Sequence, residues 1–146
     1  MENWLLLGLL AAVAYGVSGL LTKVASGPGH LGMEPRAVAL LTGLGIIATF
    51  GAYFLLQGNL ALPSNSTGIA AGLAVGVFWA VGTLLVINAY AGGADAAKVV
   101  PIFNMNTLIV VGLSILLLHE VPRQPEMLRV AAGAVLVVIG GILVSA

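Results

Sequence analysis

The sequence predicts an all-α integral membrane protein with five transmembrane helices. Hydrophobic residues make up 60% of the 146 residues and charged residues only 7%, and the mean hydropathy is +1.15. This composition excludes an ordinary soluble domain. Five apolar segments are each long enough to cross a hydrocarbon core, which takes about 20 helical residues. The charged residues and histidines lie outside the centres of these segments.

The expected spans cover residues 3–26, 36–57, 66–91, 94–119 and 125–145. The first span is too long for a cleavable signal peptide, and Met1-Glu2-Asn3 at its start contains no Lys or Arg. We therefore expect a retained helix. Turn residues separate the spans: Ser26-Gly27-Pro28-Gly29-His30 with Glu34-Pro35, Gly58-Asn59 through Pro63-Ser64-Asn65, Ala91-Gly92-Gly93, and Glu120-Val121-Pro122-Arg123. Asp95 stands where a side chain can cap the fourth helix. Because all loops are short, we expect residues 1–146 to form a single transmembrane domain.

The fourth segment contains an interruption. Pro101 removes one helical hydrogen bond and leaves the carbonyl of Ala97 without its usual donor. Irregular backbone at membrane depth is tolerated where protein or a water-filled cavity satisfies it, and broken helices of this kind form binding sites in secondary transporters. A kinked helix that only packs fits the same pattern, because proline is common in membrane helices.

The first four helices each place small and polar side chains on one face, which predicts a shared cavity. In the third helix, Gly68, Gly72, Gly76 and Ala80 form a stripe that another backbone can approach closely. The candidate cavity-lining residues are Tyr15, Ser18, Thr22, Trp79, Thr83, Tyr90, Asn104 and Thr107. The fifth helix has no polar side chain between Arg129 and Ser145, which indicates a packing or dimerising helix.

Each candidate also fits a structural role. Ser and Thr hydroxyls in helices commonly bond back to their own backbone, and Tyr90 lies near a helix end, where aromatic belts are usual. Trp79 and Asn104 lie nearer the middle of their spans. Either a contact with the substrate or a contact between helices would explain them.

The charged residues exclude several functions. No ionisable group lies at the centre of a span, which disfavours proton coupling through a mid-membrane carboxylate. Three charged residues lie near helix ends: Lys23, Asp95 and Lys98. They could form a gate at one mouth of the cavity or anchor the helices at the membrane interface. Without a basic surplus we expect no nucleic-acid partner.

Enzymatic and metal chemistry have little support. The chain has no cysteine, which excludes disulfides and thiolate metal sites. Neither the His119-Glu120 pair nor His30 matches a metal-ligand spacing, and no Ser/His/Asp arrangement is present. We therefore expect no catalytic activity, metal or cofactor.

Several segments resemble the EamA-type domain of the drug/metabolite transporter superfamily. They are Ala89-Tyr90, the run from Ala94 to Ile102, the run from Leu116 to Glu120, and Gly133 through Gly141, with Trp4 to Lys23 similar to the domain's first helix. The similarity covers essentially the whole chain as one short, five-helix unit. It implies an export-type carrier of small metabolites, in which two inverted units enclose a central cavity. From the helix faces, we expect the substrate to contact the candidate residues. Phe103-Asn104 stands where short members often carry a charged or polar pair, so no charge-based contact is implied there.

The organisation of the chain suggests how the carrier is completed. Five spans are half of the ten expected of two inverted repeats, and the 146 residues contain no internal repeat. Arg123 and Arg129, with the terminal amine, lie on the N-terminal side and Lys23, Arg36 and Lys98 on the other, so neither orientation is favoured. We expect an antiparallel, dual-topology homodimer in the inner or plasma membrane of a prokaryote, with the lipid bilayer, a second copy and a small-molecule substrate as partners. A heterodimer with a paralogous half-unit and a non-transporting accessory subunit are the alternatives.

Overall fold

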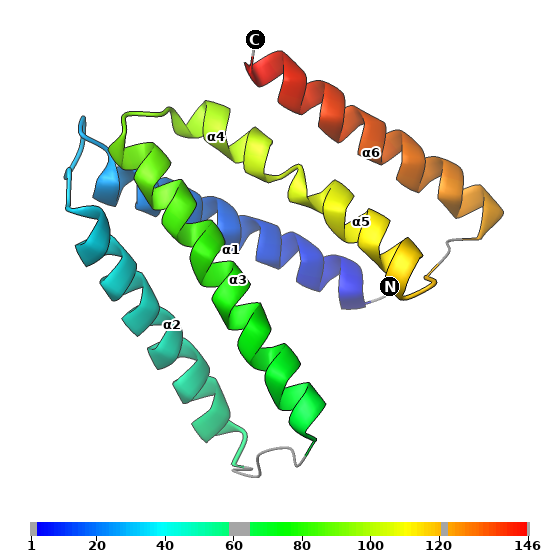
Figure 1. The fold of residues 1–146 in the computed structure, drawn as a ribbon, viewed down its shortest axis with the longest axis horizontal. Helices are drawn as coiled ribbons and strands as arrows, with labels where there is room; N and C mark the ends of the chain where they lie inside the picture. The colour runs from blue at the N-terminus through cyan, green and yellow to red at the C-terminus, as the bar shows by residue number, and fades with distance from the viewer. Residues whose placement is uncertain (1–2, 59–64, 121–122, 146) are drawn as a thin grey trace. The chain divides into compact units, whose positions relative to one another are not determined.

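The described residues form an all-helical membrane protein. The computed structural model describes residues 3–58, 65–120 and 123–145, and these contain no β-strand. The helices are α1 (Asn3–Ser26), α2 (Pro35–Leu56), α3 (Ser66–Ala91), α4 (Ala96–Phe103), α5 (Asn106–Leu117) and α6 (Gln124–Ser145) (Figure 1). Five spans are long and apolar enough to cross a membrane: Trp4–Ser26, Pro35–Leu56, Ser66–Ala91, Ala96–Leu117 and Glu126–Val144. The predicted fold class is confirmed, with α4 and α5 together forming the fourth span. The turn residues expected at 59–64 and 121–122, and the flank at 1–2, lie outside the described residues.

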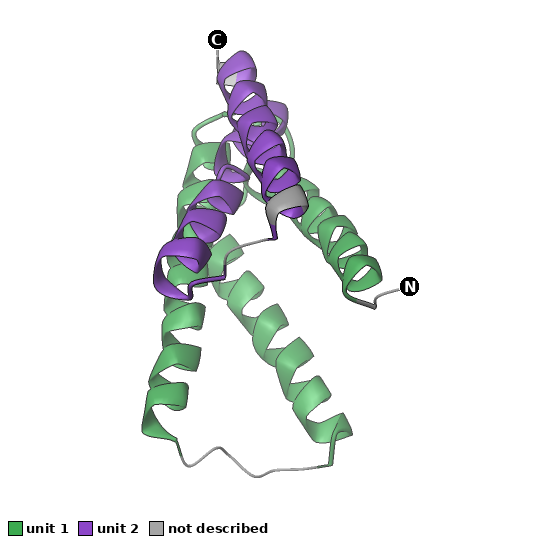
Figure 2. Ribbon diagram, turned by 90° about the vertical axis from the view of Figure 1, so that its right-hand side faces the viewer, with its two compact units in different colours: residues 1–94 green, residues 95–146 purple. Residues whose placement is uncertain are grey.

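The chain divides into two compact units, Met1–Ala94 and Asp95–Ala146 (Figure 2). In the first unit, α3 packs against both α1 and α2. In the second, α4 packs against α6. A single domain over the whole chain stays a prediction.

Local sequence sets the helix ends of the first unit. Asn65 caps α3, because its Oδ1 accepts from the amides of Thr67 at 3.0 Å and Gly68 at 3.4 Å. At the other end Gly93 adopts a φ of 92°, a left-handed conformation that glycine tolerates. The Gly93 amide donates to the Tyr90 carbonyl at 3.0 Å and the Ala94 amide to the Ala89 carbonyl at 3.1 Å, which closes α3 in a Schellman motif.

The packed core of the first unit lies at one end. Among the described hydrophobic side chains, Val38, Ile87 and Tyr90 are buried, and Ser26 is the buried polar residue. These residues come from the C-terminal ends of α1 and α3 and the N-terminal end of α2, which converge, whereas the opposite ends of the three helices diverge (Figures 1 and 2).

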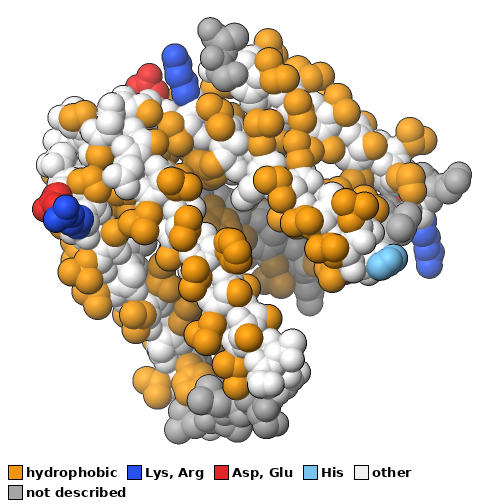
Figure 3. All heavy atoms as spheres, in the orientation of Figure 1, with side chains coloured by type: hydrophobic (Ala, Val, Ile, Leu, Met, Phe, Trp, Pro, Cys, Tyr) orange, Lys and Arg blue, Asp and Glu red, His pale blue; other side chains and the backbone are white. Residues whose placement is uncertain are grey.

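On the face drawn in Figure 3, hydrophobic side chains cover the helices and charged side chains lie near helix ends. Such a surface is what lipid requires, since charges are costly in the bilayer centre.

Candidate functional site

The fourth span is broken near its middle. α4 continues through Pro101, and Asn104 and Met105 form a turn before α5 begins. The amide of Met105 donates to the Ile102 carbonyl at 3.1 Å, and the amide of Thr107 to the Asn104 carbonyl at 3.2 Å. Both bonds are of the tighter i to i−3 type. The predicted interruption is present, but it lies three residues beyond the proline. The helix continues through Pro101 because the fixed φ of proline is compatible with a helix and its missing N–H affects only the preceding turn.

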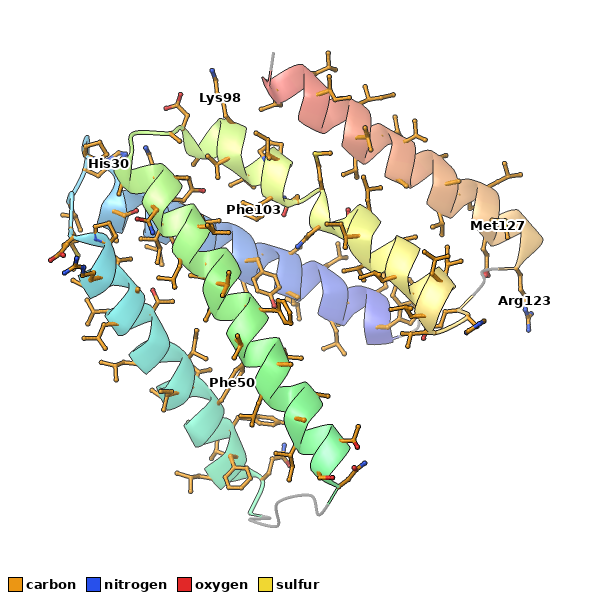
Figure 4. All side chains as sticks on the ribbon, in the orientation of Figure 1. His30, Phe50, Lys98, Phe103, Arg123 and Met127 are labelled. Atoms are coloured by element: carbon orange, nitrogen blue, oxygen red, sulfur yellow. The ribbon has the colours of Figure 1, made fainter. Side chains whose placement is uncertain are left out.

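Depth follows from helix geometry. The span Ala96–Leu117 has 22 residues, which at about 1.5 Å per residue is about 33 Å. Asn104 and Asn106 therefore lie close to the centre of the span. Phe103, the last residue of α4, marks the break in Figure 4.

Met105 fixes the rotation of the broken segment within the second unit. A β-carbon added at the buried Gly141 of α6 would lie 2.8 Å from Sδ and 3.3 Å from Cγ of Met105. Because successive helical side chains point about 100° apart, seating Met105 on α6 turns Asn104 and Asn106 away from that helix. Both side chains are exposed and have no hydrogen-bond partner among the described residues.

The hydroxyls of the three candidate threonines bond back to their own backbone. Thr22 Oγ1 donates to the Ser18 carbonyl at 2.8 Å, and Thr83 Oγ1 to the Trp79 carbonyl at 2.9 Å. Thr107 Oγ1 donates to the Asn104 carbonyl at 3.0 Å. These are the local bonds common for such side chains, and they leave the oxygen lone pairs available as acceptors.

Six of the candidates share the first unit and two the second. Tyr15, Ser18, Thr22, Trp79, Thr83 and Tyr90 lie on α1 and α3, which pack against each other, while Asn104 and Thr107 belong to the second unit. Tyr15 and Trp79 are 67% and 42% exposed, and Val17 on the opposite face of α1 is 52% exposed. Side chains on both faces of α1 are thus exposed. The role of these residues in binding stays a prediction.

A lysine is held inside the closed end of the first unit. Lys23 Nζ donates to the Ala94 carbonyl at 2.8 Å and lies 5.7 Å from the centroid of the Tyr90 ring. The alkyl chain of Lys23 runs past Gly27, where an added β-carbon would lie 3.2 Å from both Cδ and Cε. Tyr90 is fully buried, and its hydroxyl has no hydrogen-bond partner among the described residues.

The sequence indicated some of this arrangement. The sequence predicted that Lys23 lies near a helix end. It did not predict the partners of Lys23, because they lie far along the chain. Glycines directly after α1 and α3 were the available signal, since close approaches and left-handed turns at helix ends favour glycine. The role of Met105 and Gly141 was missed, because a contact between two helices leaves no local pattern.

The capping expected of Asp95 is wrong. Asp95 occupies the N-cap position of α4, but its side chain makes no capping hydrogen bond. Its backbone carbonyl accepts instead from the amides of Lys98 and Val99, each at 3.0 Å. Lys98 extends away from α4 (Figure 4) and is exposed. Among the described residues, no group of three or more His, Cys, Asp or Glu is placed to hold a metal ion.

Comparison with known proteins identifies the family. The EamA-like transporter family matches residues 2–146. The chain belongs to this family. The predicted resemblance is therefore confirmed, and this EamA-like protein is a multi-pass membrane protein of transporter type.

A relative is similar over its whole matched length. An uncharacterized protein of Methanocaldococcus jannaschii is 31% identical over 145 residues, which is 99% of this chain and 98% of the relative. The matched region thus accounts for nearly all of that relative. No solved structure matches the chain.

Proposed function

We propose that this EamA-like protein is one half of a carrier that exports small metabolites, completed by a second, antiparallel copy of itself. The observation that carries the proposal is the size of the unit. Five spans cover the family match over residues 2–146, whereas a carrier with two inverted repeats needs both halves. The relative is matched over 98% of its own length. This coverage supports a protein whose chain contributes one such unit to the carrier.

The positive charges suit both orientations. With five crossings, Arg123 and Arg129 would lie on one side of the membrane and Lys23, Arg36 and Lys98 on the other. Positive residues in short loops orient a membrane protein, and a difference of one gives little bias. Arg36 also lies beside Glu34, with Nε 3.5 Å from Oε1. A chain inserted in both orientations can pair with its own inverted copy.

The substrate is proposed to bind between α1 to α5 of the two copies. Its contacts are the eight candidate residues, among which Trp79 and Asn104 have side chains that are exposed and not bonded back to the backbone. Trp79→Ala and Asn104→Ala should lower transport with normal dimer yield, and Val17→Ala should change neither. Equal loss of dimer in the polar variants would instead assign them to packing.

Topology is the decisive test. The cysteine-free chain allows single variants Gln57→Cys and His30→Cys, both at exposed positions beyond opposite ends of α2. An impermeant thiol reagent should label about half of each variant from each side of the membrane. Labelling of the two variants from opposite single sides would overturn the inverted homodimer.

The oligomeric state separates the remaining assemblies. The chain purified alone in lipid should cross-link as a dimer. A single orientation with no self-association would point to a paralogous half-unit as the partner, or to an accessory subunit of a larger protein.

A further inference from the structure

We infer that the break at Asn104–Met105 binds a small monovalent cation, either the ammonium group of the transported molecule or a free sodium ion. The inference deepens the proposed function, and it rests on that function for the part of the site contributed by a second copy.

Two backbone carbonyls lose their usual donors at the break. The carbonyl of Ala97 receives no bond from Pro101, because proline has no N–H. The carbonyl of Pro101 loses its donor because the Met105 amide donates to Ile102 instead, at 3.1 Å. Irregular backbone is tolerated at membrane depth only where protein or a water-filled cavity satisfies it. These carbonyls therefore need a donor or a cation.

A third oxygen lies on the same face. The spacing of four and three residues places Ala97, Pro101 and Asn104 along one side of α4 and of the turn that follows it. The Asn104 side chain is exposed and has no hydrogen-bond partner among the described residues. Met105 is seated against Gly141, where an added β-carbon would lie 2.8 Å from Sδ, and this contact holds the turn in place. The face thus presents two carbonyls without their usual i+4 donors, together with the side-chain oxygen of Asn104.

The charges around the break select the ligand. The C-terminal end of a helix carries partial negative charge and favours cations, and unwound carbonyls with half-helix ends coordinate cations in transporters. Between Lys98 and His119 the chain has no positively ionisable side chain to hold an anion, and between Asp95 and Glu120 it has no carboxylate. Divalent cations are usually held by carboxylates. A monovalent cation remains the best match.

The depth of the break lets two copies share the site. In an antiparallel dimer the two-fold axis lies in the membrane plane, so a feature at mid-membrane keeps its depth in the second copy. A feature near a helix end would instead move to the opposite side. The breaks of the two copies therefore lie at the same level, where both can contribute oxygens to one cation.

Binding of two probes tests the inference on the full chain reconstituted in lipid nanodiscs. Radiolabelled sodium and radiolabelled methylammonium are titrated at constant ionic strength, with choline, which has no N–H, replacing the probe cation. We expect saturable binding of at least one probe. Pro101→Ala, which restores an N–H to α4, and Asn104→Leu should each weaken binding about tenfold or more. Ser114→Ala is the matched control, because the Ser114 hydroxyl donates to the Val111 carbonyl at 3.1 Å, and it should bind like the parent.

The outcomes are distinct. Methylammonium binding supports a substrate ammonium group, and binding of sodium alone supports a free ion. Absence of saturable binding by both probes, or binding that survives both Pro101→Ala and Asn104→Leu, overturns the inference. Pro101→Ala should unfold no more easily than the parent, so loss of binding there reports the site and not misfolding. Dual-topology dimers that bind neither probe would refute only this inference, whereas a fixed orientation with intact binding would refute only the proposed function.

Discussion

Replacing Lys23 with methionine tests the closed end of the first unit. Lys23→Met removes the hydrogen bond from Nζ to the Ala94 carbonyl, 2.8 Å long, and the contact with the Tyr90 ring at 5.7 Å. A hydrogen bond to a charged group contributes about 1.5–3 kcal/mol, and a cation–π contact about 0.5–2 kcal/mol. Lys23 is only half-buried, so solvent screens both terms, and the desolvation cost of the charge is also removed.

The expected loss of unfolding free energy is therefore about 2 kcal/mol. Methionine keeps an unbranched apolar chain beside Gly27, which separates the effect of the charge from that of packing. Unfolding of the purified protein in mixed micelles, driven by SDS and followed by helical circular dichroism, measures the change. Lys98→Met is the matched control, because that exposed side chain has no partner among the described residues, and it should shift the free energy by less than about 0.5 kcal/mol. Equal effects of the two variants would refute the assigned role of Lys23.

Substitutions at Tyr90, Gly27 and His119 test local features by the same unfolding assay. Tyr90→Phe removes a buried hydroxyl without a partner among the described residues and should stabilise by about 1 kcal/mol; a loss of stability would reveal a partner for the hydroxyl. Gly27→Ala places a β-carbon 2.7 Å from the Lys23 carbonyl oxygen and should lower the unfolding free energy by about 2 kcal/mol or more. Gly8→Ala is the control, because nothing lies within 4 Å of the added β-carbon, and it should leave the unfolding free energy unchanged or raise it. His119 has a φ of 57°, so His119→Gly should stabilise by up to about 1 kcal/mol and His119→Val should destabilise; the opposite order would contradict the left-handed turn.

Local signals in the sequence account for most helix boundaries. α1 and α3 have the bounds expected from the apolar runs, since Asn65 caps the start of α3 and Gly93 closes its end. The bonds from Thr22 and Thr83 to their own helices are equally local, and the sequence allowed for them as the structural alternative.

The sequence by itself determined the membrane fold, its five spans and a proline-marked interruption in the fourth, because hydropathy and turn chemistry act over neighbouring residues. Only the tertiary structure decided where that interruption falls and which way it faces, since Met105 meets Gly141 from a different helix. It also decided that Lys23 bonds to Ala94, 71 residues away. Such contacts depend on how helices pack, and no periodicity in one helix records the surface of its neighbour.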